Sequence, residues 1–158
     1  MNVERIKSVN LEEGVEMLGF PKEDYMPLKD YESWRVAVLK SCENTKCENI
    51  NWMQKHLFTD EVFVLLDGHC TLLVAGEGEV PENFKAIEMI PHKIYNIKKG
   101  YWHNHVLDEN GEVLIVENQN TTDDNSPVYS LNETEINQLR KCVDKHREIS
   151  VERVKNGK

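Results

Sequence analysis

The middle of this chain is a succession of short β-prone segments separated by turn residues, and this pattern restricts the fold more than any other feature. Between residues 34 and 118, runs rich in β-branched and aromatic residues alternate with polar loops that contain glycine, proline, asparagine or aspartate. The predicted strands are 34–39, 50–56, 62–66, 69–74, 84–90, 92–97, 102–107 and 113–118. Seven or eight short strands with closely spaced turns predict an all-β sandwich or barrel.

One turn carries a specific prediction about strand pairing. Asp67-Gly68 separates the segments 62–66 and 69–74 by a two-residue loop of the type that closes tight β-hairpins. We therefore expect these two segments to form an antiparallel hairpin.

Two helices are predicted outside the β-rich region. Asn10, followed by Glu12 and Glu13, has the form of a helix N-cap and predicts a short helix from about Leu11 to Leu18. Asn132-x-x-Glu135 resembles a capping box. Apolar or amphipathic residues then recur at helical spacing, namely Ile136, Leu139, Val143 and His146 or Ile149. We expect an amphipathic C-terminal helix over about residues 132–150, packed on the β-structure or on a second subunit.

Length and charge exclude several classes of function. A chain of 158 residues suits one domain, 1–158, with a sizeable core. Its net charge of -9 disfavours binding to nucleic acid or to anionic lipid.

The longest aliphatic or aromatic run, Val62 to Leu66, is too short to span a membrane, and residues 1–7 show no apolar signal region. The four cysteines suit reduced thiols, so we expect a cytoplasmic protein.

The segment before the Asp67-Gly68 turn carries the chemistry. Gln54-x-His56-x4-Glu61 places an imidazole and a carboxylate ahead of a strand, and Gly100-x-x-His103 supplies a second imidazole further along the chain. Two histidines and one carboxylate are a minimum set that holds a divalent transition metal with positions left open. The alternative is a metal-free core in which His56, Glu61 and His103 hydrogen-bond one another.

These segments resemble the two motifs of the cupin superfamily. Gln54-x-His56-x4-Glu61-x6-Gly68 is similar to the first motif and Gly100-x-x-His103 to the core of the second, as in a small single-domain cupin of bacterial type. The resemblance covers about residues 32–118. It implies a double-stranded β-helix, the cupin jelly-roll barrel, with a divalent metal (Fe, Mn, Ni or Zn) on His56, Glu61 and His103.

The chain departs from the family pattern at the first motif, where Gln54 replaces a histidine. Gln54 offers a carbonyl oxygen, a weaker transition-metal ligand than imidazole. Strand alternation places His105 on the same face as His103, so His105 is expected to line the barrel, and we assign catalytic roles to Glu61 and His105.

Three further residues are candidates for substrate binding. Arg35 has the chemistry to pair with a substrate carboxylate, the alternative being a surface salt bridge. The other two, Tyr95 and Trp102, are expected either to line the pocket or to pack in the core.

The leading hypothesis is a metal-dependent cupin enzyme that acts on a small polar metabolite, such as a carboxylate, a ureido compound or a sugar derivative. Isomerase, lyase and dioxygenase reactions all fit such a site. The alternatives are a non-catalytic cupin that binds a small ligand, with or without metal, and a purely structural interaction domain. Because similar proteins often form homodimers, a homodimer is expected.

Overall fold

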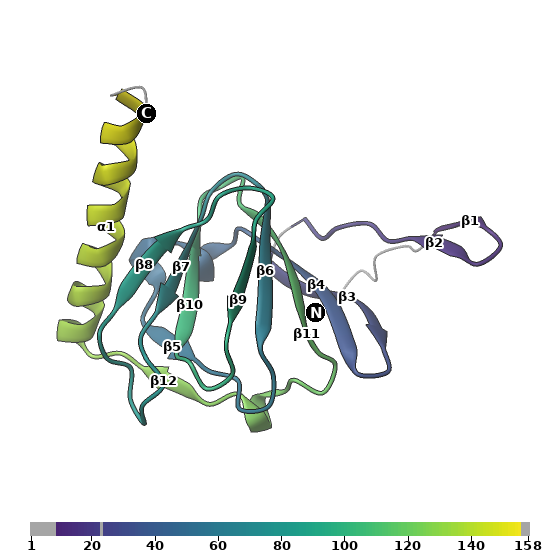
Figure 1. Ribbon diagram of the computed structural model, residues 1–158, viewed down its shortest axis with the longest axis horizontal. Coiled ribbons are helices and arrows are strands. Elements are labelled where there is room, and N and C mark those ends of the chain that lie inside the picture. Colours follow the sequence, from purple (N-terminus) through teal and green to yellow (C-terminus); the bar gives the residue numbers. More distant parts are fainter. Residues whose placement is uncertain (1–8, 23, 156–158) are drawn as a thin grey trace.

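Two five-stranded antiparallel sheets face each other in the computed structural model, which describes residues 9–22 and 24–155 (Figure 1). The first sheet has the order β3-β4-β11-β6-β9, with β3 Asp24–Tyr31, β4 Trp34–Lys40, β11 Glu112–Asn118, β6 Glu61–Asp67 and β9 Ile94–Ile97. The second has the order β12-β5-β10-β7-β8, with β12 Val128–Ser130, β5 Trp52–Gln54, β10 His103–Leu107, β7 Cys70–Val74 and β8 Lys85–Glu88. Three short 3-10 helices lie in the loops at Glu43–Thr45, Cys47–Asn49 and Asp123–Asn125. This jelly-roll sandwich confirms the predicted fold class.

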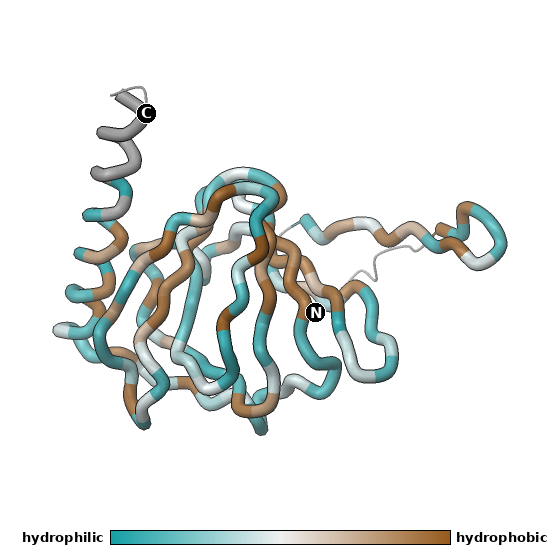
Figure 2. Tube along the Cα trace, in the orientation of Figure 1, coloured by the Kyte–Doolittle hydropathy of each residue, from teal (hydrophilic) through white to brown (hydrophobic). Residues whose placement is uncertain are grey.

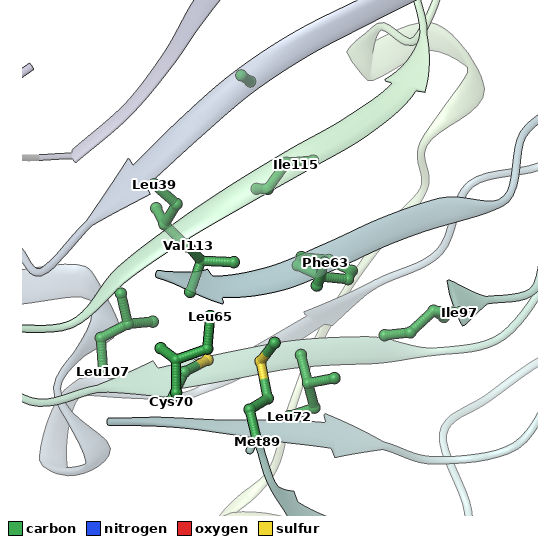
Figure 3. Packing of buried hydrophobic residues seen from close by; sticks show 11 residues of the cluster. Leu39, Phe63, Leu65, Cys70, Leu72, Met89, Ile97, Leu107, Val113 and Ile115 are labelled. Atoms are coloured by element: carbon green, nitrogen blue, oxygen red, sulfur yellow. The ribbon is translucent and has the colours of Figure 1, made fainter. Parts of the chain in front are cut away.

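A period of two along the strands builds the core between the sheets. On β6 the buried positions are Glu61, Phe63 and Leu65, while the residues between them are more exposed. The apolar members meet side chains of the opposite sheet, as Figure 3 shows. The cluster consists of Ala37, Leu39, Phe63, Leu65, Cys70, Leu72, Met89, Ile97, Leu107, Val113 and Ile115. Figure 2 shows hydrophobic residues interspersed with polar ones along the strands of both sheets.

The predicted hairpin at Asp67-Gly68 is wrong, because this turn connects the two sheets. β6 pairs with β11 and β9, whereas β7 pairs with β10 and β8. Gly68 has a φ of +65°, and a Cβ atom there would lie 2.5 Å from the backbone of Asn110. Gly68 supplies the positive φ of the turn, but β6 and β7 each bury a face on one shared core. That burial favours opposite sheets over direct pairing.

The predicted N-terminal helix over Leu11–Leu18 is also wrong. The chain forms a small hairpin of β1, Val9–Glu12, and β2, Val15–Met17, which projects away from the sandwich in Figure 1. Gly14 lies in the turn at a φ of +79°, a left-handed conformation that interrupts an α-helix. The β-branched Val15 directly after it also favours an extended chain.

The C-terminal helix is confirmed as α1, Glu133–Lys155. A capping box starts it: the backbone N–H of Glu135 donates to Asn132 Oδ1 at 3.0 Å, and that of Asn132 donates to Glu135 Oε2 at 2.8 Å. Leu139 and Val143 are buried against the outer face of the second sheet, so α1 lies along β8 (Figure 1).

Some residues used for the predictions lie outside the described part of the structure. They are residues 1–7, which were read for a signal region, and the side chains at positions 146 and 149. Among the helices that are described, none combines the length and the apolar character that crossing a membrane requires.

Candidate metal centre

Three buried side chains, two from separate strands and one from a loop, converge on one point between the sheets. Glu61 begins β6, His103 begins β10, and His56 lies two residues beyond the end of β5. Glu61 Oε2 lies 3.1 Å from His56 Nε2 and 2.9 Å from His103 Nε2. The exposed fractions of Glu61, His56 and His103 are only 5%, 6% and 1%. Residues distant in the sequence are therefore brought together as a single candidate metal site, as the motifs predicted.

The Nδ1 atom of each histidine ring, which lies on the side of the ring away from Glu61, makes a hydrogen bond within the protein. His103 Nδ1 lies 2.9 Å from the carbonyl oxygen of Tyr101, which only accepts, so Nδ1 carries the hydrogen. His56 Nδ1 lies 2.8 Å from Ser126 Oγ, and that hydroxyl donates in turn to Asn125 Oδ1 at 3.3 Å. This chain favours a hydrogen on Nδ1 of His56 as well. Both neutral rings then direct an Nε2 lone pair at Glu61, the orientation in which histidine binds a metal.

The donor set fits a divalent transition metal. Two nitrogen or oxygen ligands at about 2.1 Å from a metal and at right angles are about 3 Å apart, close to the separations seen here. Histidine nitrogens with one carboxylate are a combination that such metals prefer, and a nitrogen lone pair facing a carboxylate is unfavourable unless a proton or a cation lies between them. The residues present therefore fit the metal that the motifs implied.

In the metal-free protein, protons must take the place of the cation. Burial lowers the pKa of His56, but the hydrogen bond and the charge of Glu61 outweigh it and hold this pKa above its ordinary value. Burial likewise raises the pKa of Glu61, and the two histidines more than reverse the effect, so the carboxyl group has a pKa well below its usual range. The site thus stays polar and internally paired without metal.

His105 lies on the same face of β10 as His103, as strand alternation predicted. Its Nδ1 atom is buried and has no hydrogen-bond partner among the described residues. Burial lowers the pKa of His105 to about 4, despite the opposing charge of Glu61, so this ring is neutral at neutral pH. The ring belongs to the same cavity wall as His56 and Glu61.

A cavity of about 310 Å³ opens next to these residues. Its wall includes four of the residues predicted for the site besides Glu61: Arg35, Gln54, His56 and His105. The remaining wall residues are Asp24, Tyr25, Leu39, Cys42, Asn44, Thr45, Trp52, Ile115, Glu117, Thr121, Thr122, Asp123 and Ser126. The volume suits a small ligand.

Two of the predicted substrate-binding residues lie elsewhere. The hydroxyl of Tyr95 accepts from the backbone N–H of Ile90 at 2.8 Å, and the indole N–H of Trp102 donates to the carbonyl oxygen of Gly78 at 2.9 Å. Neither side chain lines the cavity. Arg35 does line it, but its Nε and Nη2 atoms bind the two carboxylate oxygens of Asp30 at 2.8 and 3.0 Å.

The structure also places residues in the cavity wall that sequence reasoning missed. Glu117 on β11 is buried, and the hydroxyl of Tyr25 donates to its Oε1 at 2.6 Å. Burial raises the pKa of Glu117, and the carboxylate of Glu61 adds to this effect, against the hydrogen bond from Tyr25. Alternation with Val113 and Ile115 was a signal that could have identified Glu117 as inward-facing. No comparable signal marked Tyr25, because its strand was not predicted.

No protein-family model matches the chain, and no curated protein matches its sequence. Solved structures do resemble it. Pac13 from Streptomyces, a nucleoside dehydratase also solved with uridine, has a TM-score of 0.52 and 8% identity over 84% of this chain and 92% of that chain. A cupin-2 domain protein from Shewanella frigidimarina has a TM-score of 0.45 and 17% identity, over 63% of this chain and 85% of that chain. KdgF from a Halomonas species has a TM-score of 0.44 and 11% identity, over 75% of this chain and 90% of that chain.

These likenesses concern the fold alone. The similarity to Pac13 covers most of both chains, yet so low an identity says nothing about substrate or cofactor. The two-sheet jelly roll, with both motif segments meeting between its sheets, agrees with that similarity. The predicted jelly-roll fold is confirmed.

Proposed function

We propose that this chain is a metal-dependent cupin enzyme that acts on a small polar metabolite. One observation carries the proposal: the Nε2 atoms of His56 and His103 converge on one carboxylate oxygen of Glu61, in a buried position beside a cavity. The metal would be a divalent transition ion such as Fe, Mn, Ni or Zn. Gln54, in the same wall, is a further oxygen donor near the site.

Each residue has a defined task in this proposal. A bound metal supplies a Lewis acid that polarises a carbonyl or hydroxyl oxygen of the substrate. Glu61 neutralises charge at the site, and Ser126 and the Tyr101 carbonyl hold the two histidine rings in the ligating orientation. His105 lines the same cavity, and its buried Nδ1, which has no partner among the described residues, would accept from a substrate donor once the ring turns toward the cavity. The buried setting limits access of bulk water to this end of the cavity.

Isomerase, lyase and dioxygenase reactions remain the classes that this site would support. Pac13, a nucleoside dehydratase whose structures include uridine, supports the proposal at the level of the fold: a jelly roll of this shape serves an enzyme of small polar molecules. A cavity of about 310 Å³ is of the size that admits such a substrate.

Metal content tests the proposal directly. Protein purified without chelator and then reconstituted with Fe(II), Mn(II), Ni(II) or Zn(II) should hold about one equivalent of metal by elemental analysis. The double variant His56→Ala, His103→Ala should hold less than about a tenth of an equivalent. The matched control is His69→Ala, His92→Ala, which removes two exposed histidines and should bind metal like the wild type.

A competing function is a metal-free cupin that binds a small ligand without catalysis. The mutual hydrogen bonds of His56, Glu61 and His103 favour it, because they satisfy these groups without a cation. Wild-type protein with less than about a tenth of an equivalent after reconstitution would overturn the metalloenzyme and leave this second function.

A further inference from the structure

The charges around the cavity are unevenly distributed. Its wall contains four carboxylate side chains, those of Asp24, Glu61, Glu117 and Asp123. Among the described residues of the wall, Arg35 is the one side chain with a permanent positive charge. A ligand that enters this cavity therefore meets more negative than positive charge.

The charge of Arg35 is already paired within the protein. Its Nε and Nη2 atoms bind both carboxylate oxygens of Asp30, and its Nη1 atom lies 3.8 Å from Glu117 Oε1. Asp30 occupies the bidentate Nε/Nη2 fork, and Asp30 and Glu117 together compensate the charge of Arg35. An anion in the cavity therefore gains little net attraction from Arg35.

Glu117 places a carboxylate in the cavity wall beside the metal site. Along the paired strands β11 and β6, Ile115 lies opposite Phe63 and Val116 opposite Val62. Continuing this register places Glu117 next to Glu61, on the same inward face. The bond from Tyr25 occupies Oε1 of Glu117. The other oxygen, Oε2, makes no hydrogen bond to a described residue and remains a free acceptor.

We propose that this cavity selects uncharged or cationic ligands over anionic ones, and that Glu117 is the residue that determines this specificity. The inference rests on the proposed metal site and narrows its substrate class. The metal takes an oxygen of the substrate, and Glu117 in the adjoining wall takes a neighbouring hydroxyl or amino group. Of the substrates considered from the sequence, sugar derivatives and ureido compounds fit, and those that direct a carboxylate at Glu117 do not.

Three matched hydroxamates test the inference on the Co(II)-substituted full chain. Each binds metal through the same hydroxamate group, and they differ only at the far end: butyrohydroxamate ends in methyl, β-alanine hydroxamate in ammonium, and succinic monohydroxamate in carboxylate. Changes in the visible absorption of cobalt report the binding of each at about pH 8, where the carboxylate probe is ionised. The wild type should bind the methyl and ammonium probes at least about tenfold more tightly than the carboxylate probe.

Variants assign the effect to Glu117. Glu117→Gln keeps an acceptor for Tyr25 and should reduce the preference against the carboxylate probe by about threefold or more. Glu112→Gln is the control: it lies on the same strand, removes the same charge, and pairs with Lys40 away from the cavity. It should leave the preference unchanged.

The outcomes are distinguishable. Equal affinities of the wild type for the three probes, or an unchanged preference in Glu117→Gln, would overturn the inference while leaving the metal site intact. A protein that shows no cobalt absorption before any hydroxamate is added would overturn the proposed function, and this inference with it.

Discussion

Glu61 Oε2 and His103 Nε2 lie 2.9 Å apart, although 42 positions separate the two residues in the chain. The hydrogen on His103 Nδ1 is committed to the Tyr101 carbonyl, so the contact with Glu61 is favourable only with a proton or a cation between the two atoms. The chemistry of the site thus follows from the orientation of one imidazole ring.

Ser126→Ala should weaken metal binding without removing a ligand. Ser126 holds Nδ1 of His56, and the loss of such an outer partner costs roughly 10- to 100-fold in metal affinity. Titration of the metal-free protein with Zn(II) in a competing chelator measures the change. Ser130→Ala, an exposed serine on β12, is the control and should bind like the wild type. Equal affinities of both variants would show that Ser126 does not orient the ring.

Metal affinity should fall as the pH falls through neutrality. Glu61 raises the pKa of His56 above its ordinary value of about 6.5, so in the metal-free protein a proton competes for this nitrogen already near pH 7. Binding isotherms for Zn(II) at about pH 6, 7 and 8 should show the steepest loss between the two lower values. An affinity that is flat across this range would contradict the ligand role of His56.

His105 should lower the stability of the metal-free protein, kept in chelator, in mild acid. Its pKa is about 4 in the folded chain, below its ordinary value, so the unfolded chain binds the extra proton. Its contribution is present above about pH 6.5 and is lost as the pH falls toward 4. Between about pH 7.5 and pH 5, the wild type should lose roughly 2 kcal/mol of unfolding free energy more than His105→Gln does. Urea denaturation with chelator at both pH values measures this difference, and equal losses would contradict it.

Gly68→Ala should be strongly destabilising. The substitution combines a φ of +65° with a Cβ atom 2.5 Å from the backbone of Asn110, so we expect a loss of about 3 kcal/mol or more. Gly14→Ala is the matched control, because its φ of +79° is similar but no atom lies within 4 Å of the added Cβ. It should cost only about 1 kcal/mol, through backbone strain alone. Similar losses in both variants, measured by urea unfolding, would show that steric contact at Gly68 is unimportant.

Much of the candidate site was accessible from the sequence because it depends on spacing within strands. The period of two placed His105 beside His103 on one face of β10, and the structure agrees. The prediction for positions 54 and 56 was less accurate, because β5 ends at Gln54 and His56 lies in the following loop. His56 still reaches the site, since Ser126 holds its ring from the far side.

Other parts of the site depend on contacts between strands, which cannot be predicted from a local sequence pattern. Tyr25 reaches Glu117 from β3, a strand whose polar and proline-containing sequence gave no clear β signal. Arg35 was a candidate for substrate binding, but its guanidinium pairs with Asp30 across the β3–β4 pair. Such partners become visible only when the register between strands is known.

The sequence by itself determined that His103 and His105 share a face, where α1 begins, and which three side chains are suited to a metal. These features depend on residues only a few positions apart, through side-chain alternation and helix capping. Only the tertiary structure decided that β6 and β7 lie in opposite sheets, that Val9–Met17 forms a hairpin, and that Glu117 faces the cavity beside Glu61. Strand pairing is selected by burial of whole sheet faces over a common core, a non-local free energy that a strong turn signal such as Asp67-Gly68 does not outweigh.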